Sequence, residues 1–302
     1  MRSITAEDKP LLIIGGGSNL LLTRDFPGLV LHSAIMGREV VKESEGKVWL
    51  RCGSGETWDD IVAYAVEKGW HGAENLSLIP GEVGASAVQN IGAYGAEAKD
   101  LIAKVEAVEI ATGNVVEFSN EDCRYAYRQS RFKNEWKDHY VITYVTYCFS
   151  LDFCPDLDYG NIRHSLEEQG ISKPTAQQLR QTIINIREAK LPDPKVTGNA
   201  GSFFMNPVVG RDVYERLAAQ HEGMPHYVVD ADHIKIPAGW MIEQCGWKGA
   251  SLGRVGVHDR QALVLVNRGG ATGEEVVTLY KRIIEDVRAK FGIEIHPEVN
   301  VI

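Results

Sequence analysis

The chain has 302 residues and a formal net charge of −9, from 32 Lys and Arg against 41 Asp and Glu. This length exceeds what a single core usually fills, so we expect two or three subdomains. The acidic balance with interspersed signs argues against a protein that binds nucleic acid or an anionic membrane, because both surfaces attract clustered Lys and Arg.

The cysteines and the N-terminus bear on cellular location. Five cysteines without a Cys-x-x-Cys pair indicate reduced, buried core thiols rather than a disulfide framework or a metal site. Residues 1–10 contain acids and no apolar run, which argues against a secretory signal. The most apolar run, 11–22, is interrupted by glycines and too short to span a bilayer. We expect a cytoplasmic protein without membrane insertion.

The first predicted strand covers residues 11–14, and a second apolar run follows at 20–22 after Gly15-Gly16-Gly17-Ser18-Asn19. A plain hairpin is one interpretation of this pattern. The other is an anion site, because successive backbone N–H groups in a glycine turn form a concavity suited to a pyrophosphate. The spacing is not that of the Gly-x-Gly-x-x-Gly dinucleotide fingerprint.

Residues 48–52 predict a strand, and a helix is predicted to follow it. Thr57 and Asp60 suggest a capping box at the helix start, and Gly69 should end the helix. The apolar spacing predicts a buried face of Trp58, Ile61, Val62, Ala65 and Val66.

Residues 78–95 contain four glycines and the uncharged amides Gln89 and Asn90. Such a run is too polar for a core and too glycine-rich for a regular element. It suits a flat, polyfunctional cofactor, which needs bare backbone groups and side-chain amides at close approach. The alternative is a long loop.

Strands are predicted to dominate 102–149, with a hairpin turn at 112–114. Thr175 and Gln178 then form a capping box that opens a helix to Lys190. The prolines of Leu-Pro-Asp-Pro at 191–194 end this helix and mark a boundary between domains.

The C-terminal part alternates helices and strands, which is typical of an α+β unit. We predict a helix starting at Pro237, a strand at 262–266, a long helix at 272–291 and a final strand at 293–299. In the long helix, Thr272 and Glu275 form the cap and Gly292 the end. Its predicted buried residues are Val276, Tyr280, Ile283 and Val287.

The segment 198–207, Gly-Asn-Ala-Gly-Ser-Phe-Phe-Met-Asn-Pro, surrounds the hydroxyl of Ser202 with small residues and aromatics. Small residues allow another molecule to approach the backbone, and Phe203 and Phe204 would exclude water from it. On this interpretation, the Ser202 hydroxyl takes part in the chemistry of the site. The other interpretation is a turn followed by a buried aromatic strand.

Taken together, these motifs resemble those of the UDP-N-acetylenolpyruvoylglucosamine reductase (MurB) family, in its type with a tyrosine loop. The matching motifs are Gly-Gly-Gly-Ser-Asn at 15–19, Ile-Pro-Gly at 79–81, Gln-Asn-Ile-Gly-Ala-Tyr-Gly at 89–95, Tyr-Arg-Gln-Ser at 127–130, Lys-Leu-Pro-Asp-Pro-Lys at 190–195, the segment around Ser202, Pro-Ala-Gly-Trp at 237–240 and His-Pro-Glu-Val at 296–299. They follow the family's order from residue 12 to 300.

The resemblance implies an α+β fold: a two-part FAD-binding domain of the vanillyl-alcohol-oxidase type, followed by a C-terminal α+β substrate-binding domain. The implied divisions are 1–152 for FAD, 153–192 for the tyrosine loop and connecting helix, 193–292 for substrate, and 293–302 for a strand returning to the active site. The cofactor-binding positions carried over are Gly15, Gly16, Gly17, Ser18, Asn19, Pro80, Gly81, Gln89, Asn90, Gly92, Ala93, Tyr94 and Gly95.

The implied activity is that of a UDP-N-acetylmuramate dehydrogenase of peptidoglycan precursor synthesis. UDP-N-acetylglucosamine enolpyruvate is reduced by NADPH through bound FAD. Ser202 matches the family's proton donor, and Glu298 and Arg128 match the residues that hold and polarise the substrate carboxylate. Without the resemblance, Arg128 is equally a surface ion-pair partner and Glu298 a solvated strand-end acid. The residues carried over to UDP binding are Tyr159, Lys190, Asn206 and Gln261.

The chain departs from the family at Met205, where relatives can carry lysine, and at Asp259-Arg260. Family members also have a β-α-β stretch before the glycine turn, whereas ten residues precede Leu11 here. Either the sequence begins too late or the protein lacks this layer. The second case predicts an exposed sheet edge and a thinner FAD adenine site.

Two other classes of function stay open at this stage. One is a different flavin oxidoreductase of the same fold, against which the Ser202 and Glu298 motifs count. The other is a catalytically silent relative that binds a UDP-sugar, which a bound flavin chromophore would distinguish from the enzymes.

Overall fold

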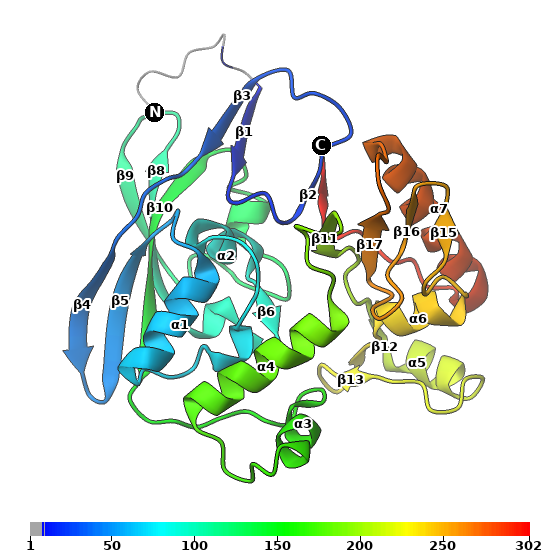
Figure 1. The fold of residues 1–302 in the computed structure, drawn as a ribbon. Coiled ribbons are helices and arrows are strands. Elements are labelled where there is room, and N and C mark those ends of the chain that lie inside the picture. Colours follow the sequence, from blue (N-terminus) through cyan, green and yellow to red (C-terminus); the bar gives the residue numbers. More distant parts are fainter. Residues whose placement is uncertain (1–7, 9) are drawn as a thin grey trace. The chain divides into compact units, whose positions relative to one another are not determined.

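The computed structural model describes residue 8 and residues 10–302, which form two compact units (Figure 1). The first unit comprises the chain up to Ser18 together with Phe26–Ala189. The second comprises Asn19–Asp25 and Lys190–Ile302. The N-terminal segment in which we expect no secretory signal lies almost entirely outside the described residues.

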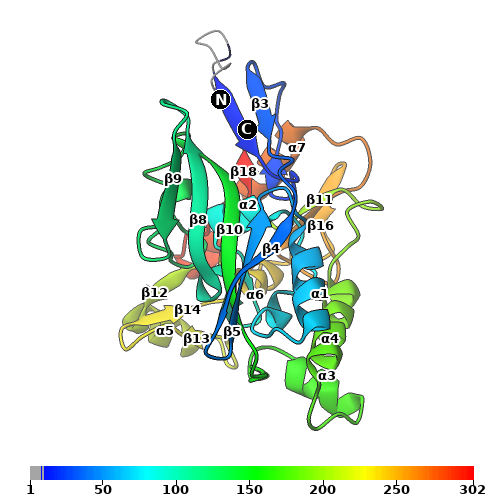
Figure 2. The same ribbon diagram turned by 90° about the vertical axis from the view of Figure 1, so that its left-hand side faces the viewer.

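A five-stranded antiparallel sheet forms the framework of the first unit (Figure 2). Its order is β4 (Arg38–Ser44), β5 (Lys47–Gly53), β10 (Tyr140–Ser150), β8 (Ile102–Glu109) and β9 (Val115–Ser119). On β5, Val48, Leu50 and Cys52 alternate toward the core, as a one-sided sheet requires. The strands expected at 48–52 and in 102–149 are confirmed, as is the β8–β9 hairpin.

Helix α1 (Trp58–Lys68) packs its apolar face into the core of the first unit. All five predicted residues are buried, and the indole N–H of Trp58 donates to the Leu76 carbonyl at 3.0 Å. Gly69 ends the helix at φ 73°, as predicted. The predicted capping box is wrong, because the Thr57 side chain forms no cap hydrogen bond.

The expectation that 78–95 contains no regular element is wrong. Residues Val83–Gln89 form helix α2, whose two alanines favour a helix. Gly84 is required inside it, because a Cβ at this position would lie 2.9 Å from the Cβ of Ser54. Asn90 ends the helix in the left-handed region, with φ 46°.

Short elements complete this part of the chain. They are η2 (Glu74–Leu76), β6 (Gly92–Ala93), β7 (Ala96–Glu97), η3 (Ala98–Asp100) and η4 (Arg131–Lys133).

The hairpin interpretation of 11–22 is also wrong. Strand β1 (Leu11–Ile14) pairs in parallel with β3 (Leu29–His32) in the first unit. Strand β2 (Leu20–Leu21) belongs to the second unit, where it pairs in parallel with β18 (Asn300–Val301). The glycine turn is therefore a connection between two different sheets.

Helices α3 (Ile162–Glu168) and α4 (Ala176–Lys190) close the first unit. The capping box of α4 is confirmed: Thr175 N–H donates to Gln178 Oε1 at 2.9 Å, and Gln178 N–H donates to Thr175 Oγ1 at 3.2 Å. Helix α4 is tied to α1 by Arg180, whose two terminal nitrogens donate to the Asp59 carboxylate at 2.7 and 2.9 Å.

The second unit contains two antiparallel sheets and three helices. One sheet has the order β11 (Asn199–Ser202), β17 (Val264–Asn267), β16 (Val255–Val257) and β15 (Ser251–Leu252). The other has the order β12 (Val208–Gly210), β14 (His233–Lys235) and β13 (Tyr227–Val228). The helices are α5 (Arg211–Ala218), α6 (Ala238–Gln244) and α7 (Gly273–Phe291).

The predictions for α7 hold at both ends of the helix. The Thr272–Glu275 capping box is present, and Gly292 ends the helix at φ 68°. The buried face is shifted along the helix: Ile283 and Val287 are buried as predicted, whereas Val276 and Tyr280 are only partly buried. Leu279 and Phe291 complete this face.

Two strand predictions near the C-terminus need correction. Strand β17 starts at Val264, two residues later than expected. Residues 293–299 form no strand, and the last strand is the short β18. Ile293, Ile295 and Val299 nevertheless alternate into the core, which explains why this segment has the apolar pattern of a strand.

All five cysteines are free, but the prediction that all are buried is wrong. Cys52 and Cys123 are buried, Cys148 and Cys245 are partly buried, and Cys154 is exposed. Among residue 8 and residues 10–302, no group of three or more His, Cys, Asp and Glu side chains could hold a metal ion.

No helix in the described part of the chain has both the length and the apolar character needed to cross a bilayer.

The Asp59–Arg180 pair gives a prediction for stability. Burial opposes ionisation of Asp59, but hydrogen bonds from Arg180 and the Leu78 N–H outweigh burial and lower its pKa. A carboxyl with a lowered pKa stabilises the fold fully above its unfolded pKa, and this stabilisation is lost as pH falls through the folded pKa. Asp59→Asn should therefore reduce the free energy of unfolding at pH 7 by about 1–3 kcal/mol, and this deficit should shrink in acid, below about pH 4.

Urea unfolding at pH 7 and in acid measures this difference. Asp60→Asn, an exposed carboxylate on the same helical turn, is the matched control and should leave stability within about 0.5 kcal/mol. Equal losses in the two variants at pH 7 would contradict the role assigned to the buried pair.

Candidate functional site

The two glycine-rich segments of the first unit lie against each other. The Ser18 hydroxyl donates to the Pro80 carbonyl at 3.4 Å. A Cβ added to Gly81, where φ is 117°, would lie 3.1 Å from Ser18 Oγ, and one added to Gly15 would lie 3.1 Å from the Cβ of Ala85. Both glycines are needed for this close approach, which brings together motifs that are far apart in the sequence.

The glycine turn fits the pyrophosphate of a dinucleotide cofactor. Gly16 and Gly17 are exposed, and Gly17 has φ 73°, so the turn presents bare backbone next to the Ser18 hydroxyl. Backbone N–H groups in such a turn are suitable donors to phosphate oxygens. The residues present therefore match the donor set that a pyrophosphate requires.

A carboxylate also lies beside this turn, and sequence reasoning missed it. Glu82 oxygens are 3.3 and 3.4 Å from the positions that Cβ atoms on Gly15 and Gly16 would occupy. The imidazole of His32 lies against both oxygens of this carboxylate, with its Nε2 at 2.9 and 3.0 Å.

Asn90 has a structural role in the loop that follows α2. Its side chain is completely buried, donates to Glu97 Oε2 and the Ala126 carbonyl, and accepts from Lys99 N–H. These partners occupy the amide. The predicted contact of Asn90 with a cofactor would therefore come from its backbone.

Arg128 lies against the same loop. Its guanidinium donates to the Gly92 carbonyl at 2.6 Å and to the Asn90 carbonyl at 3.4 Å. A Cβ on Gly92 would lie 3.0 Å from a terminal nitrogen of Arg128, so glycine is required here. Arg128 itself has φ 55°, a conformation in which few non-glycine residues are found. The backbone thus holds this guanidinium in a defined place.

The tyrosine loop packs on Tyr94 and Gly95. A Cβ on Gly95 would lie 3.4 Å from the Cβ of Tyr159, and one on Gly160 would lie 3.6 Å from the Tyr94 ring. The amide of Asn75 donates to the carbonyls of Tyr94 and Asp156, which fixes both loops at one point. Tyr159, Tyr94 and Gly95 are therefore neighbours in the first unit.

Arg187 on α4 is a further charged residue near Tyr94. Burial lowers its pKa, although the nearby Tyr94 and Asp59 oppose this effect. Burial likewise raises the pKa of Tyr94. One feature of the sequence could have indicated Arg187. It falls four residues after Ile183, next to the apolar stripe of α4, where a charged residue is unexpected.

In the second unit, backbone hydrogen bonds join the segment that carries Ser202 to the segment that carries Glu298. Glu298 N–H donates to the Phe203 carbonyl at 2.8 Å, and Met205 N–H donates to the His296 carbonyl at 3.0 Å. Ser202 is exposed at the end of β11, and Glu298 is partly buried. The two predicted catalytic residues of this unit thus stand on adjacent strand-like segments.

The expected role of Phe203 and Phe204 needs correction. Both are buried in the core of the second unit, with 2% and 1% of their surface exposed, and Phe203 packs on Tyr280 with ring centroids 5.2 Å apart. They anchor the segment beneath Ser202 rather than shielding its hydroxyl from water.

Asn19, the last residue of the glycine motif, is part of the second unit. Its amide donates to the Glu298 carbonyl at 3.2 Å, and its own carbonyl accepts from Asn300 N–H at 3.1 Å. The residue predicted to bind the cofactor therefore also holds the segment that carries Glu298.

The residues predicted to bind UDP are divided between the units. Tyr159 belongs to the first, whereas Lys190 at the end of α4, Asn206 and Gln261 belong to the second. The amide oxygen of Asn206 accepts from Ala238 N–H at 2.9 Å, and that of Gln261 accepts from Leu263 N–H at 3.2 Å.

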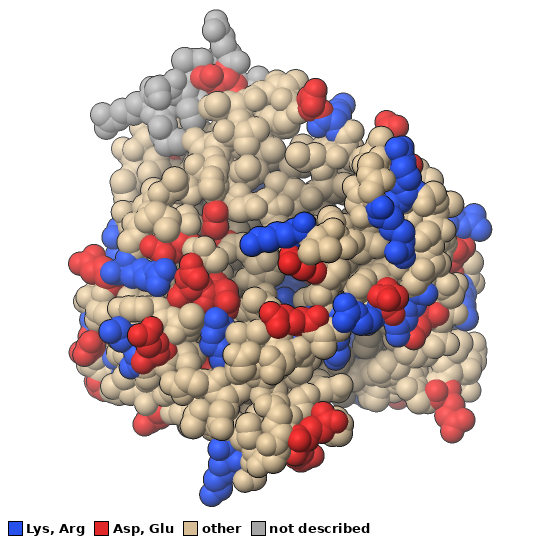
Figure 3. Space-filling model, in the orientation of Figure 1, with Lys and Arg blue, Asp and Glu red and all other residues tan. Residues whose placement is uncertain are grey.

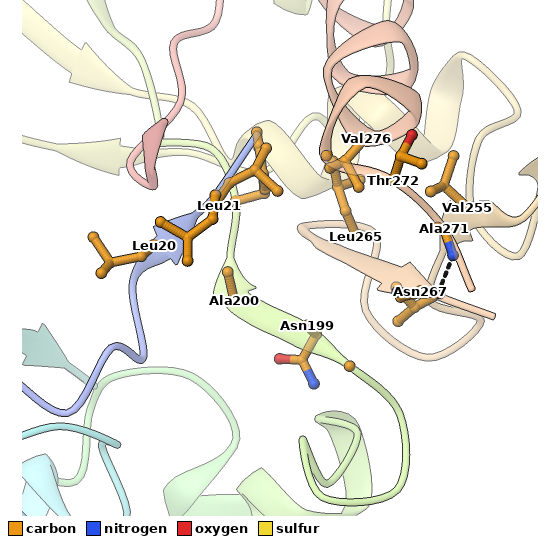
Figure 4. A pocket seen from close by; sticks show the side chains of 15 residues that line it. Leu20, Leu21, Asn199, Ala200, Val255, Leu265, Asn267, Ala271, Thr272 and Val276 are labelled. Atoms are coloured by element: carbon orange, nitrogen blue, oxygen red, sulfur yellow. Dashed lines mark hydrogen bonds between the residues drawn. The ribbon is translucent and has the colours of Figure 1, made fainter. Parts of the chain in front are cut away.

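A separate pocket of about 240 Å³ lies between β2, β11 and the start of α7 (Figure 4). Most of its lining side chains are apolar, and its two amide oxygens are occupied: that of Asn199 accepts from Gly201 N–H, and that of Asn267 accepts from the Gly269 and Ala271 N–H groups. None of the lining residues is a predicted catalytic or UDP-binding residue.

Charged side chains of both signs are distributed over the surface. Among the described residues drawn in Figure 3, Lys and Arg are interspersed with Asp and Glu. On this face, neither sign forms a single continuous patch.

Two protein-family models match this chain. The model described as "FAD binding domain" matches residues 1–119, and the model described as "UDP-N-acetylenolpyruvoylglucosamine reductase, C-terminal domain" matches residues 193–302. Together they define a flavoprotein oxidoreductase with an N-terminal FAD-binding domain.

Relatives over the full length narrow this class. UDP-N-acetylenolpyruvoylglucosamine reductases from Bacteroides fragilis and Porphyromonas gingivalis are 56% and 51% identical to the chain, over 97% and 98% of it and 87% of each relative. The reductase of Pseudomonas aeruginosa is 49% identical, over 97% of the chain and 86% of the relative. The chain belongs to the UDP-N-acetylenolpyruvoylglucosamine reductase family.

A solved structure has the same fold. The reductase from Thermus caldophilus superposes with a TM-score of 0.64 at 21% identity, covering 97% of this chain and 85% of that one. The predicted fold is confirmed as an FAD-binding domain followed by a C-terminal α+β domain.

The carboxylate beside the glycine turn gives a prediction for FAD affinity. A negative charge near an anionic pyrophosphate opposes binding, and a partly screened charge of this kind is worth about 1 kcal/mol or less. Glu82→Gln should therefore tighten FAD binding to the apoprotein about two- to fivefold, and His32→Ala should weaken it.

Quenching of flavin fluorescence on titration measures both dissociation constants. Glu43→Gln, which removes an exposed carboxylate from β4, is the control for net charge and should leave the dissociation constant unchanged. An unchanged or higher dissociation constant in Glu82→Gln would show that the carboxylate does not act on the cofactor.

Proposed function

We propose that this protein reduces UDP-N-acetylglucosamine enolpyruvate to UDP-N-acetylmuramate, a step of peptidoglycan precursor synthesis. The reductant is NADPH. Membership of the reductase family over nearly the whole chain supports this function. The observation that carries it is the backbone pairing that puts Ser202 and Glu298 on neighbouring segments of the second unit.

The reaction adds a hydride to one alkene carbon and a proton to the carbon that bears the carboxylate. When bound, FAD would supply the hydride-transfer chemistry between NADPH and the alkene, and the glycine turn at 15–19 together with Pro80 and Gly81 would hold it. The protein must supply the proton and stabilise the negative charge that develops on the enolate-like intermediate.

Ser202 donates the proton to the carbon that bears the carboxylate. Its exposure at the end of β11 supports this role, because an exposed hydroxyl is accessible to a ligand. A serine hydroxyl is a weak acid, but it suffices for so basic a carbon. Gly201, with φ 71°, and the irregular register between β11 and β17 turn the chain at this point.

Glu298 and Arg128 hold and polarise the substrate carboxylate. Arginine suits this task because its planar guanidinium can donate two parallel hydrogen bonds to a carboxylate. The contacts of Arg128 with the Gly92 and Asn90 carbonyls keep it in place. Glu298 is kept in place by its own backbone bond to Phe203 and by Asn19.

Substrate binding belongs mainly to the second unit, since Lys190, Asn206 and Gln261 all lie there with Ser202 and Glu298. Tyr159 contributes from the tyrosine loop of the first unit. The division into an FAD domain at 1–152, a connecting part at 153–192, a substrate domain at 193–292 and a last segment at 293–302 is part of the same proposal. Five free cysteines support a cytoplasmic location.

The purified protein should contain a flavin chromophore and oxidise NADPH only when UDP-N-acetylglucosamine enolpyruvate is present. Flavin without this dependence would favour another oxidoreductase of the same fold. Substrate binding without flavin would favour a catalytically silent relative.

The two half-reactions separate the role of Ser202 from that of the cofactor. Ser202→Ala should leave bleaching of the flavin by NADPH nearly unchanged, because this step needs no proton from the serine. Reoxidation by the enolpyruvyl substrate should slow by about 10² to 10⁴, the usual effect of removing a positioned acid. Glu298→Gln should impair the same second step, since an amide replaces neither the charge nor the proton transfer of the carboxyl.

Stopped-flow absorbance of the flavin follows each step by itself. Ser172→Ala, an exposed serine of the first unit, is the matched control and should leave both rates unchanged. If Ser202→Ala slowed bleaching and reoxidation alike, the serine would be a packing residue and its assignment as proton donor would fail.

A further inference from the structure

The amide of Asn206 has one possible orientation. Ala238 N–H donates to its Oδ1 at 2.9 Å, and only the oxygen of an amide can accept such a bond. The NH₂ group is therefore directed away from Ala238. Ala238 is the first residue of α6, where a backbone N–H has no partner within the helix, so Asn206 satisfies a donor that would otherwise lack an acceptor.

The amide of Gln261 is oriented by the same rule. Leu263 N–H donates to its Oε1 at 3.2 Å, which leaves the NH₂ group as a donor for another molecule. Both residues thus present N–H donors and keep their oxygens on the protein. A phosphate or diphosphate group, which offers only acceptors, complements such a pair.

Gly239 provides the space in which the Gln261 amide lies. A Cβ on Gly239 would be 3.2 Å from Gln261 Oε1 and 3.2 Å from Leu263 Cγ, closer than most such contacts in proteins. Glycine inside a helix costs about 0.5–1 kcal/mol relative to alanine, so a helical glycine with this close approach has a specific reason to be there.

The first turn of α6 is itself rigidly held. Pro237 precedes it with φ −62°, and Ala238, Met241 and Ile242 are completely buried in the core of the second unit. The backbone that meets Asn206 and the glycine that meets Gln261 are consecutive residues of this turn. A shift of the turn would therefore change both amides together.

We propose that Gly239 is a positioning residue for substrate: the turn Pro237–Gly239 of α6 sets Asn206 and Gln261 as paired N–H donors to the diphosphate of the UDP-sugar. This inference rests on the proposed function, which places both amides in substrate binding. It adds the direction of their hydrogen bonds and the residue that maintains it.

Gly239→Ala tests this role. The added methyl group must push the Gln261 amide aside, so the KM for UDP-N-acetylglucosamine enolpyruvate should rise about 3- to 20-fold, the usual effect of disturbing one hydrogen bond to a charged group. The kcat should change less than threefold, and bleaching of the flavin by NADPH should not change. Gln244→Ala, exposed at the other end of α6, should leave KM unchanged.

A double-mutant cycle separates positioning from a general effect on structure. If Gly239 acts through Gln261, the Gly239→Ala penalty in KM should be smaller in a Gln261→Ala background, because only the Asn206 amide is then left to displace. Additive penalties in an active protein would overturn the inference while leaving the proposed function intact. A Gly239→Ala protein with a slower flavin bleaching rate or lower FAD content would also overturn it, because the effect would then be one on the fold.

The same measurements keep the two hypotheses apart. If the unaltered protein neither binds the UDP-sugar, as measured by titration calorimetry, nor reduces it, the proposed function fails and the inference fails with it. If the unaltered protein is active and the cycle is non-additive, both stand.

Discussion

The backbone pairing of residues 203–205 with 296–298 is the constraint on which the candidate site of the second unit depends. Two hydrogen bonds, Glu298 N–H to Phe203 O at 2.8 Å and Met205 N–H to His296 O at 3.0 Å, join segments from opposite ends of the second unit. Buried aromatic side chains hold one segment, and Ile295 and Val299 hold the other. The neighbours of Ser202 and Glu298 in the chain thus supply much of the packing that holds these two predicted site residues in place.

Features specified within a few residues of sequence are predictable here. The capping boxes of α4 and α7, the left-handed glycines after α1 and α7, and the apolar face of α1 all follow from local spacing. The absent capping box of α1 shows the limit of prediction from local spacing. Thr57 has the right residue type and position, but its side chain forms no cap hydrogen bond. The glycine content of 78–95 likewise led us to expect no helix where α2 lies. Gly84 is present there because it contacts Ser54 closely, not because the chain forms a loop.

Features specified across long separations were not predictable from local pattern. The apolar runs at 11–14 and 20–22 look like the arms of a hairpin, yet each finds a parallel partner elsewhere. The predictions at Ser202, Glu298 and Arg128 rest instead on family motifs, which need no knowledge of strand pairing. They gave no indication of Glu82 or Arg187, because these side chains matter through the neighbours that the fold provides.

The parallel pair β2–β18 also has a consequence for how the protein is made. Asn19 and Glu298 are 279 positions apart, and Thr23 N–H reaches the carbonyl of Ile302 at 2.7 Å. Contacts of such separation carry a large loop-closure cost and form late. During synthesis, the segment 19–25 waits for nearly the whole chain before its partner emerges from the ribosome. Glu298, the proposed partner of the substrate carboxylate, is thus held by Asn19 only once the chain is nearly complete.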